Sequence, residues 1–554
     1  MRDTGIPVMR SAAARVMLLV LLACSSRPER SSQAAEAPSE APPAAAGTLT
    51  LLVLPVERVE VMYERFLPLK RHLQKTLGME VALHVARDDE SARKEIGRGE
   101  VQIAFLDPAA YCGLRARFHE KVGPLASAVG RDGGGSRSVL VARGGSGITR
   151  IVDAGGKRLA LGTRESAFSY VMPLAMFEDL GIKPKDFKSV DLLQQEERVA
   201  LSVLIGAHDV GGISEAVAKK YVSDGLKVLK TSETVSRYMI CSSPSLSAEL
   251  RQRIVTALQQ LKDTAVLSSI DPDIGGFVPA EDRDYDMVRV MIRNVTGEDH
   301  VEYGPRTVKV AVLPLYSPIT MYERYEPLMR YLSRETGREF KLVIPRDFED
   351  FMSLVQKGTV QFSYQNPYVF ALLSKDVPVR ALLTTISERD KEAADGFRGV
   401  IFTRDDSPIR NIAQLKGKSV LVVSRKSAGG FLSQRLFLER AGIDVERELT
   451  LVEGKRHESV ILGVYRGEAA AGFVRESALV ELKDEIDMKR IRVIARATLL
   501  PDWPFAVRGN VDPALADSVK RLLLGLGGNE LLRAAKIERF RLPQTGEFDS
   551  LEKR

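Results

Sequence analysis

One segment of the sequence concentrates groups that bind small anions. Ser424, Arg425 and Ser427 place hydroxyls and positive charge directly before a helical pattern, and Gly429-Gly430 would let a ligand approach the backbone. The start of a helix exposes unpaired N–H groups and about half a positive charge, which favours an oxyanion. The segment therefore predicts an oxyanion site. A structural alternative stays open, because serine commonly caps helices and paired glycines permit close packing.

A second segment has the same outline with different chemistry. Its hydroxyl and cationic side chains are Thr163, Arg164, Ser166 and Ser169. Glu165 adds a negative charge to this segment, and Phe168 stands where the other segment has glycine. We expect this segment to bind a different ligand, or none.

Two tyrosines and the absence of catalytic motifs complete the inventory of reactive groups. Tyr364 and Tyr368 follow a predicted strand, at the edge where open α/β sheets bind ligands, although packing between lobes explains them equally well. The sequence has no nucleophile elbow, Walker loop or metal-binding triad, and its six histidines are scattered. We therefore predict a binding protein without metal or cofactor. An enzyme is the competing class, and turnover of a phosphate ester would favour it.

The chain repeats itself, which explains why two segments look alike. Residues 49–111 align without a gap with residues 308–370, at an offset of 259 (314 − 55 for Pro314 and Pro55), and 21 of 63 positions are identical. This period is far too long for a solenoid, so a whole domain is duplicated. We predict copy one at residues 48–300 and copy two at residues 306–550.

Within each copy, short apolar strands alternate with helical patterns. The expected strands are 49–54, 80–85, 101–105 and 158–161 in copy one, and 308–313, 339–344, 360–364 and 419–423 in copy two. Alternation of strands and helices predicts a mostly parallel sheet with helices on both faces. A second such unit follows the first in each copy. The predicted fold class is therefore α/β, with two tandem bilobal domains.

Copy two also contains a series of motifs in a characteristic order. They are residues 310–314, 360–368, 399–409, 415–420, 427–432 and 457–460. Their order and spacing resemble the phosphate/phosphite/phosphonate ABC-transporter substrate-binding family, of the periplasmic-binding-protein type II class. Copy one resembles it more weakly, over residues 49–295. The resemblance implies two lobes that close on a ligand around two crossing strands. These crossings would lie near 397–404 and 492–508 in copy two, and near 137–143 and 229–242 in copy one.

The resemblance also carries single residues over to this chain, with departures. His457 stands where phosphonate binders of the family carry a ligand-contacting histidine, and Glu197 is in that place in copy one. Phe348 and Phe397 stand where those binders have tyrosines, and we keep Phe397 as a candidate ligand contact. Alanine replaces the family's acidic residue at 469–470. An aminoalkyl phosphonate is thereby disfavoured, and the expected ligand is a small anion such as phosphate, phosphite or a phosphonate.

The N-terminus has the pattern of an export signal. Arg10 and Arg15 precede the apolar run 16–23, which is shorter than the ~20 residues that a membrane-spanning helix needs. The residues around Cys24 resemble a bacterial lipobox, which implies lipidation of its thiol. We predict a signal peptide at 1–23 and an Ala/Pro-rich tether at 24–47. The alternative is a plain secretory signal in which Cys24 has no role.

Composition limits the remaining possibilities. The 80 Lys and Arg and the 73 Asp and Glu residues are interleaved and leave a net charge of only +7, so a nucleic-acid partner is not expected. Cys112 and Cys241 form either one disulfide or two buried free thiols. We expect a lipoprotein of the periplasm or cell envelope that delivers its ligand to an ABC permease in the inner membrane. The alternative role is ligand sensing for a membrane signalling protein.

Overall fold

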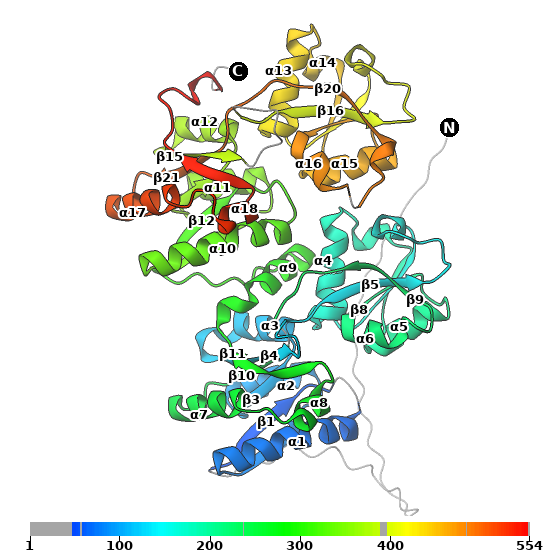
Figure 1. Ribbon diagram of the computed structural model, residues 1–554, viewed down its shortest axis with the longest axis vertical. Helices are drawn as coiled ribbons and strands as arrows, with labels where there is room; N and C mark the ends of the chain where they lie inside the picture. Colours follow the sequence, from blue (N-terminus) through cyan, green and yellow to red (C-terminus); the bar gives the residue numbers. More distant parts are fainter. Residues whose placement is uncertain (1–46, 56–57, 237, 388–395, 484, 552–554) are drawn as a thin grey trace, which may run out of the picture. The chain divides into compact units, whose positions relative to one another are not determined.

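The computed structural model describes residues 47–55, 58–236, 238–387, 396–483 and 485–551. The predicted signal peptide, Cys24 and nearly all of the predicted tether lie outside these residues. In the described ranges, no helix combines the length and the apolar character needed to cross a bilayer. The described chain forms four α/β sheets, two in each copy (Figure 1). We name the lobes built on them 1A, 1B, 2A and 2B, in chain order.

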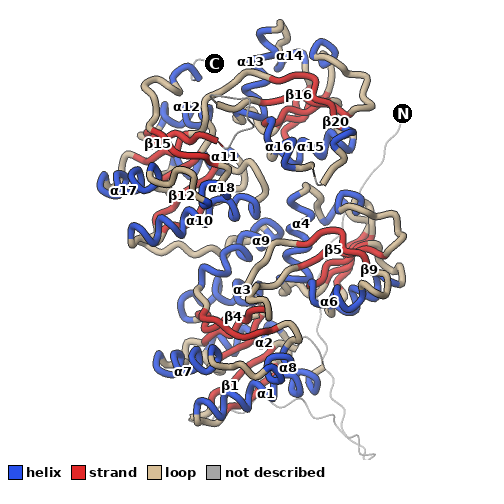
Figure 2. Tube along the Cα trace, in the orientation of Figure 1, coloured by secondary structure: helices blue, strands red, loops and turns tan. Residues whose placement is uncertain are grey.

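Copy one consists of two sheets flanked by helices (Figure 2). Lobe 1A has the strand order β11-β4-β10-β3-β1-β2, and lobe 1B has β7-β6-β8-β5-β9. The elements of lobe 1A are β1 (Leu49–Val53), α1 (Val59–Leu77), β2 (Val81–Val85), α2 (Asp89–Arg98), β3 (Ile103–Leu106), α3 (Pro108–Phe118), β4 (Gly123–Gly130), β10 (Met239–Ser242), α7 (Ala248–Gln259), α8 (Thr264–Ile270), β11 (Ile274–Pro279) and α9 (Asp286–Thr296). Those of lobe 1B are β5 (Ser138–Arg143), β6 (Arg158–Leu161), the π-helical turn η3 (Ala167–Val171), α4 (Met172–Asp179), β7 (Ser189–Leu192), α5 (Glu196–Leu204), β8 (Val210–Ser214), α6 (Glu215–Tyr221) and β9 (Leu226–Thr231).

Copy two repeats this architecture. Lobe 2A has the strand order β13-β12-β14-β21-β15-β22, and lobe 2B has β18-β17-β19-β16-β20. The elements of lobe 2A are β12 (Val308–Val312), α10 (Pro318–Thr336), β13 (Phe340–Val343), α11 (Phe348–Gln356), β14 (Phe362–Tyr364), α12 (Pro367–Asp376), β15 (Val379–Ser387), β21 (Pro504–Arg508), α17 (Pro513–Leu524), α18 (Glu530–Ala534) and β22 (Ile537–Arg541). Those of lobe 2B are β16 (Gly399–Arg404), β17 (Ser419–Val422), the π-helical turn η7 (Ala428–Leu432), α13 (Ser433–Arg440), α14 (Val445–Glu448), β18 (Thr450–Glu453), α15 (His457–Arg466), β19 (Ala471–Arg475), α16 (Glu476–Glu481) and β20 (Ile491–Arg496).

The predicted α/β class with two tandem bilobal domains is confirmed, but the sheets are mixed rather than mostly parallel. In lobe 2A, β12 pairs in parallel with β13 and β14, whereas β21 runs antiparallel to β14 and β15. The antiparallel pairs arise because the chain crosses to the second lobe and later returns. The strand that enters a lobe on this return runs in the opposite direction to the strands beside it. A sequence pattern of strands and helices does not reveal this reversal of direction.

Two chain segments connect the lobes within each copy. In copy two, β15 ends at Ser387 in lobe 2A and β16 begins at Gly399 in lobe 2B, and the chain returns between Arg496 and Pro504. Antiparallel bridges join the two connections, Phe397 to Leu500 in copy two and Ser136 to Val235 in copy one. Paired connections of this kind are a hinge about which two lobes can open and close.

Local sequence explains the main helix of the first lobe in each copy. Both α1 and α10 contain a proline at the same repeat position, Pro68 and Pro327, and both end at a glycine with φ of 65°, Gly78 and Gly337. Only glycine adopts this left-handed conformation without strain. Ser317 caps α10 by accepting a hydrogen bond from the Thr320 N–H at 3.2 Å.

Cys112 and Cys241 are both buried free thiols, so of the two alternatives the structure has no disulfide between them.

Candidate functional site

The segment predicted to bind an anion is the N-terminal cap of η7. Ser427 is 1% exposed, and its Oγ accepts a hydrogen bond from the Gly430 N–H at 3.0 Å. Its carbonyl accepts from the Leu432 N–H at 2.9 Å. Among the described residues, the N–H groups of Ala428 and Gly429 find no acceptor. The cap therefore leaves two donors free at the positive end of a helix.

The two glycines of this cap are required by close packing. A Cβ on Gly430 would lie 2.4 Å from Val423 Cγ2, and one on Gly429 would lie 3.1 Å from Arg475 Cβ and from Phe397 Cε2. Gly429 and Gly430 therefore do permit close packing, which was the structural alternative to a ligand site. The same packing places the aliphatic part of the Arg475 side chain next to Gly429, whose N–H has no acceptor among the described residues.

Arg475 is the cation of this site, and sequence reasoning missed it. It ends β19 in lobe 2B, and its guanidinium stacks on the Phe397 ring with 4.5 Å to the centroid. Its Nη2 donates to Ser387 Oγ at 3.1 Å, and Ser387 Oγ donates to Asp502 Oδ1 at 2.9 Å. Ser387 ends β15 in lobe 2A, so Arg475 reaches from one lobe to the other. Its equivalent in copy one is Ser214, which is short and neutral. This difference between the two copies was the signal by which the sequence could have indicated Arg475.

His457 lies beside Arg475 and is neutral. Its Nδ1 accepts a hydrogen bond from the Arg475 backbone N–H at 3.3 Å, so its proton resides on Nε2. The side chain is 1% exposed, and burial together with the positive charge of Arg475 lowers the pKa of His457 to about 3. His457 can therefore donate one hydrogen bond to an anion, and it contributes no charge at neutral pH.

Several buried polar groups of lobe 2A lack hydrogen-bond partners among the described residues. Gln365 follows β14 and is 0% exposed, yet neither its Nε2 nor its Oε1 has a partner within the described chain. The Nε1 of Trp503 is likewise buried without an acceptor among these residues. Buried donors and acceptors are normally satisfied, so such groups require an explanation, for example a bound solute. The Tyr364 hydroxyl lies 3.2 Å from Thr385 Oγ1, and Tyr368 packs against the apolar core of lobe 2A.

The remaining predicted residues of this segment are engaged elsewhere. Arg425 is half-exposed and forms ion pairs with Glu446 and Glu453, each at 3.4 Å. Ser424 Oγ accepts from the Lys426 N–H at 3.2 Å. Lys426 itself contacts lobe 2A, where it pairs with Glu349 and where Asn366 Nδ2 donates to its carbonyl at 3.2 Å. The two lobes of copy two therefore touch on the side of the cap.

The equivalent cap in copy one holds a carboxylate of its own chain. Ser166 caps η3 by accepting from the Ser169 N–H at 3.2 Å. The next N–H, that of Ala167, donates to Asp107 Oδ1 of lobe 1A at 2.9 Å, and the same oxygen accepts from the Ala109 N–H at 2.8 Å. Burial raises the pKa of Asp107 to about 7. A side chain thus occupies the place that a ligand oxygen would take.

Aromatic side chains pack beside this cap in copy one. Phe168 replaces Gly429 and is 1% exposed, and its ring lies 6.1 Å from that of Tyr238, which lies 5.4 Å from that of Phe105. Two other predicted residues are bonded locally. Thr163 accepts from the Ser166 N–H through its carbonyl, and Arg164 Nη1 donates to the Tyr170 hydroxyl at 2.9 Å.

The predicted equivalence of Glu197 with His457 is wrong by one residue. The Ser214 N–H donates to Glu196 Oε2 at 2.9 Å, as the Arg475 N–H donates to His457. Glu197 instead forms an ion pair with Lys220 at 3.2 Å. The left-handed residues two positions before each helix, Gln194 and Lys455, fix the alignment of the two copies here.

Comparison with known proteins identifies relatives of both copies. The family described as ABC transporter, phosphonate, periplasmic substrate-binding protein matches residues 51–285 and again 310–547. The tetrathionate sensor histidine kinase TtrS of Salmonella typhimurium is 31% identical over 231 residues, which are 39% of this chain and 39% of that kinase. The phosphate-import protein PhnD of Mycolicibacterium smegmatis is 22% identical over 233 residues, 39% of this chain and 71% of that protein. Among solved structures, PhnD1 from Prochlorococcus marinus in complex with methylphosphonate has a TM-score of 0.42 and 15% identity, over 46% of this chain and 100% of that one.

Proposed function

Because the chain belongs to the phosphonate ABC-transporter periplasmic substrate-binding protein family, we propose that copy two binds a small oxyanion between its lobes, with copy one serving as a closed, ligand-free partner domain. The anion accepts hydrogen bonds from the N–H groups of Ala428 and Gly429 and from the guanidinium of Arg475. Phosphate, phosphite and phosphonates all present three oxygens to such donors.

The observation that supports this proposal is that the Arg475 side chain packs against Gly429 at the Ser427 cap, where the N–H groups of Ala428 and Gly429 have no acceptor among the described residues. A hydrogen bond to a charged group contributes about 1.5–3 kcal/mol net, so three or four of them support a micromolar dissociation constant. His457 adds a neutral donor, and Gln365 offers a further amide whose atoms have no partner among the described residues. Of the originally predicted residues, Ser427, Gly429, His457 and Phe397 lie at this place, whereas Arg425 is neutralised by two glutamates.

Titration calorimetry of the full-length chain tests the proposal. Phosphate, phosphite and methylphosphonate are each titrated, with sulfate as a fourth oxyanion. We expect saturable heat with a stoichiometry of one for at least one phosphorus oxyanion, because in copy one the Ala167 N–H already donates to Asp107 and Phe168 stands in the place of Gly429. An absence of heat with all of them at millimolar concentration would contradict the proposal, and a stoichiometry of two would contradict the closed state of copy one.

The cellular role that we propose is delivery of the bound anion to an ABC permease by a non-enzymatic lipoprotein anchored at Cys24. The family supports the transport role, since its members are substrate-binding proteins of ABC transporters. Deletion of the gene is expected to reduce uptake of labelled phosphate or methylphosphonate. Labelled palmitate should be incorporated into the wild-type protein and be absent from Cys24→Ala, which should leave the membrane fraction.

Ligand sensing is a second candidate role, favoured by the 31% identity to a sensor histidine kinase. A duplicated binding unit in which only one copy binds the anion would report ligand state to a partner without needing to release its ligand to a permease. In that case the deletion strain keeps normal anion uptake and loses a transcriptional response to the anion. The same strain therefore separates the two roles.

A further inference from the structure

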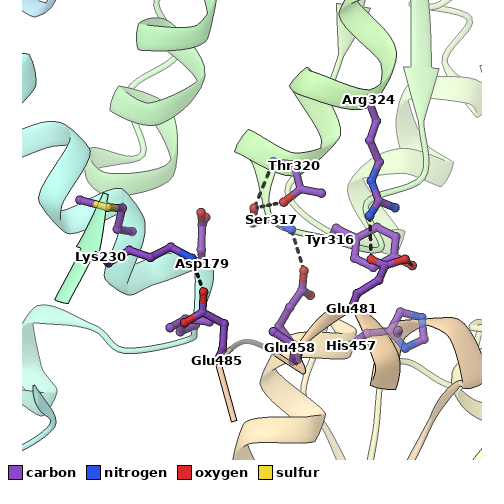
Figure 3. A pocket seen from close by; sticks show the side chains of 14 residues that line it. Asp179, Lys230, Tyr316, Ser317, Thr320, Arg324, His457, Glu458, Glu481 and Glu485 are labelled. Atoms are coloured by element: carbon purple, nitrogen blue, oxygen red, sulfur yellow. Dashed lines mark hydrogen bonds and ion pairs between the residues drawn. The ribbon is translucent and has the colours of Figure 1, made fainter. Parts of the chain in front are cut away.

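A cavity of about 330 Å³ lies where copy one meets both lobes of copy two (Figure 3). Copy one contributes the end of α4 and Lys230 of β9, lobe 2A contributes Tyr316 to Arg324 at the start of α10, and lobe 2B contributes the first residues of α15 and part of α16. A volume of this size accommodates a small organic molecule, since ligand pockets begin at roughly 300 Å³.

The charges that line this cavity are unbalanced. Its four acids are Asp179, Glu458, Glu481 and Glu485, and its two cations are Lys230 and Arg324. Both cations are already used, because Lys230 pairs with Glu485 and Arg324 Nη2 lies 2.6 Å from Glu481 Oε2. Among the described residues, Asp179 and Glu458 form no ion pair within 4 Å, unlike Glu481 and Glu485 in the same wall.

These two acids also have unsatisfied oxygens. Glu458 is 9% exposed, and its Oε1 accepts from the Ser317 N–H at 3.3 Å, whereas its Oε2 is buried without a partner among the described residues. Asp179 Oδ1 is buried in the same unpartnered state. An unpaired buried carboxylate oxygen costs considerable free energy unless a donor reaches it. In the described part of the chain, no three potential ligands are grouped as a metal site, which directs attention to an organic donor.

We propose that this cavity binds a small organic cation, through ammonium or guanidinium groups that donate to Asp179 Oδ1 and Glu458 Oε2. A charged donor compensates both carboxylates, and the apolar parts of Met176, Leu180 and Ala478 accommodate the carbon chain. His457, which the proposed anion site also uses, lines this cavity, so the two proposed sites adjoin at the start of α15. Since the wall includes both lobes of copy two, the cation would hold those lobes together and strengthen anion binding, and by linkage the anion would strengthen cation binding equally.

The pH dependence of this binding follows from the burial of the two acids. Burial raises the pKa of Asp179 and that of Glu458 to about 7. Arg456 and Lys230 face Asp179 as cations, Arg456 also faces Glu458, and Glu178 and Glu323 are the further acids nearby. Protonated carboxyls do not attract a cation, so affinity should rise between pH 6 and pH 8.

Calorimetry of the full-length chain with 1,4-diaminobutane tests the site, and butane-1,4-diol serves as the neutral analogue of the same length. We expect saturable binding of the diamine and none of the diol. Asp179→Asn and Glu458→Gln should each weaken diamine binding at least tenfold while keeping the shape of the wall. Asp517→Asn removes an exposed acid that pairs with Lys520 on α17, and it should leave the affinity unchanged.

Two results would overturn the inference. The first is an absence of saturable heat with wild-type protein at millimolar diamine. The second is equal binding by wild type, Asp179→Asn and Glu458→Gln, which would place the diamine on the general acidic surface. Thermal melting of each variant verifies folding, and either substitution alone suffices if the other variant does not fold. Because phosphate is titrated separately, failure of the cation site and failure of the anion site are distinguishable.

Discussion

In copy one, the N–H of Ala167 donates to the carboxylate of Asp107, whereas in copy two the equivalent N–H, that of Ala428, has no acceptor among the residues that the structure describes. The residue in place of Asp107 is Asn366, whose amide donates to the Lys426 carbonyl and carries no charge. The change from Asp107 to Asn366 therefore separates a cap whose first N–H donates to a carboxylate from a cap whose first N–H has no acceptor among the described residues.

The same contrast runs through the two clefts. The acids Asp89, Asp107, Glu165 and Glu196 of copy one correspond to Phe348, Asn366, Lys426 and His457 of copy two. In addition, Phe168 and Ser214 take the places of Gly429 and Arg475, so copy one loses the cation and fills its space. The two copies share a fold while differing in charge at a few cleft positions, which teaches that the ligand is chosen by the site and not by the architecture.

The largest loss of phosphate affinity should come from replacing Arg475 of copy two with serine, the residue at the equivalent position of copy one. Arg475→Ser removes the guanidinium beside the free N–H groups, and we expect phosphate to bind at least about 100-fold more weakly, since charge-assisted bonds contribute about 1.5–3 kcal/mol each. Calorimetry measures the loss. Arg425→Ser is the matched control, because its guanidinium is held by Glu446 and Glu453, and an equal loss in that variant would place the anion elsewhere.

A smaller loss should follow when copy two receives the carboxylate of copy one. Asn366→Asp puts a negative charge opposite the Ala428 N–H, and we expect about 30-fold weaker phosphate binding through competition for that donor and repulsion of the ligand. Asn411→Asp makes the same chemical change at an exposed cap of lobe 2B and should alter affinity less than about twofold. Unchanged affinity in Asn366→Asp would show that Asp107 is not what closes copy one.

A third effect concerns stability and pH. The pKa of Asp107 is about 7 in the folded chain, above the value of about 4 expected when unfolded, so folding favours its protonated form. The contribution of Asp107 to the free energy of unfolding is therefore complete below pH 4 and is lost as the pH rises through 7. Asp107→Asn should therefore reduce the drop in melting temperature between pH 5 and pH 7.5, as measured by scanning calorimetry.

Asp88→Asn supplies the control for that measurement. Hydrogen bonds from Ser91 lower the pKa of Asp88 to about 2, so its contribution is present above pH 4 and is lost only in stronger acid. The melting curves of this variant should shift equally at pH 5 and pH 7.5. If the melting curves of Asp107→Asn also shift equally at the two pH values, the Asp107 carboxyl is not the group that titrates between pH 5 and pH 7.5.

The smallest effect should come from a surface charge. Glu165 lies 4.0 Å from Arg93 and is partly exposed, so Glu165→Lys should change the melting temperature by less than about 2 °C, as expected for a weak ion pair. Made in the Arg475→Ser chain, it should not create phosphate binding in copy one, because Phe168 and Asp107 still fill the cleft. Recovery of phosphate heat in the double variant would mean that charge alone had closed copy one.

Much of the fold was accessible from sequence because it is local and repeated. Apolar strands alternating with helical patterns indicated four α/β lobes, and helix ends were marked by residues such as Gly99 and Ser427, whose roles depend on their immediate neighbours. The direction of the later strands was not accessible, since it depends on which segments return across the hinge.

Only part of the candidate site could be predicted from the sequence, for a physical reason. The sequence by itself located the Ser427 cap, His457 and the duplication, because caps and repeats are encoded in short or collinear patterns. Only the tertiary structure decided that Arg475 packs against Gly429 of the cap, that Arg425 pairs with Glu446 and Glu453, and that Asp107 accepts from the equivalent cap 60 residues away. Charges act through distance in space, and the pairing of residues across two lobes is decided by packing that no short stretch of sequence contains.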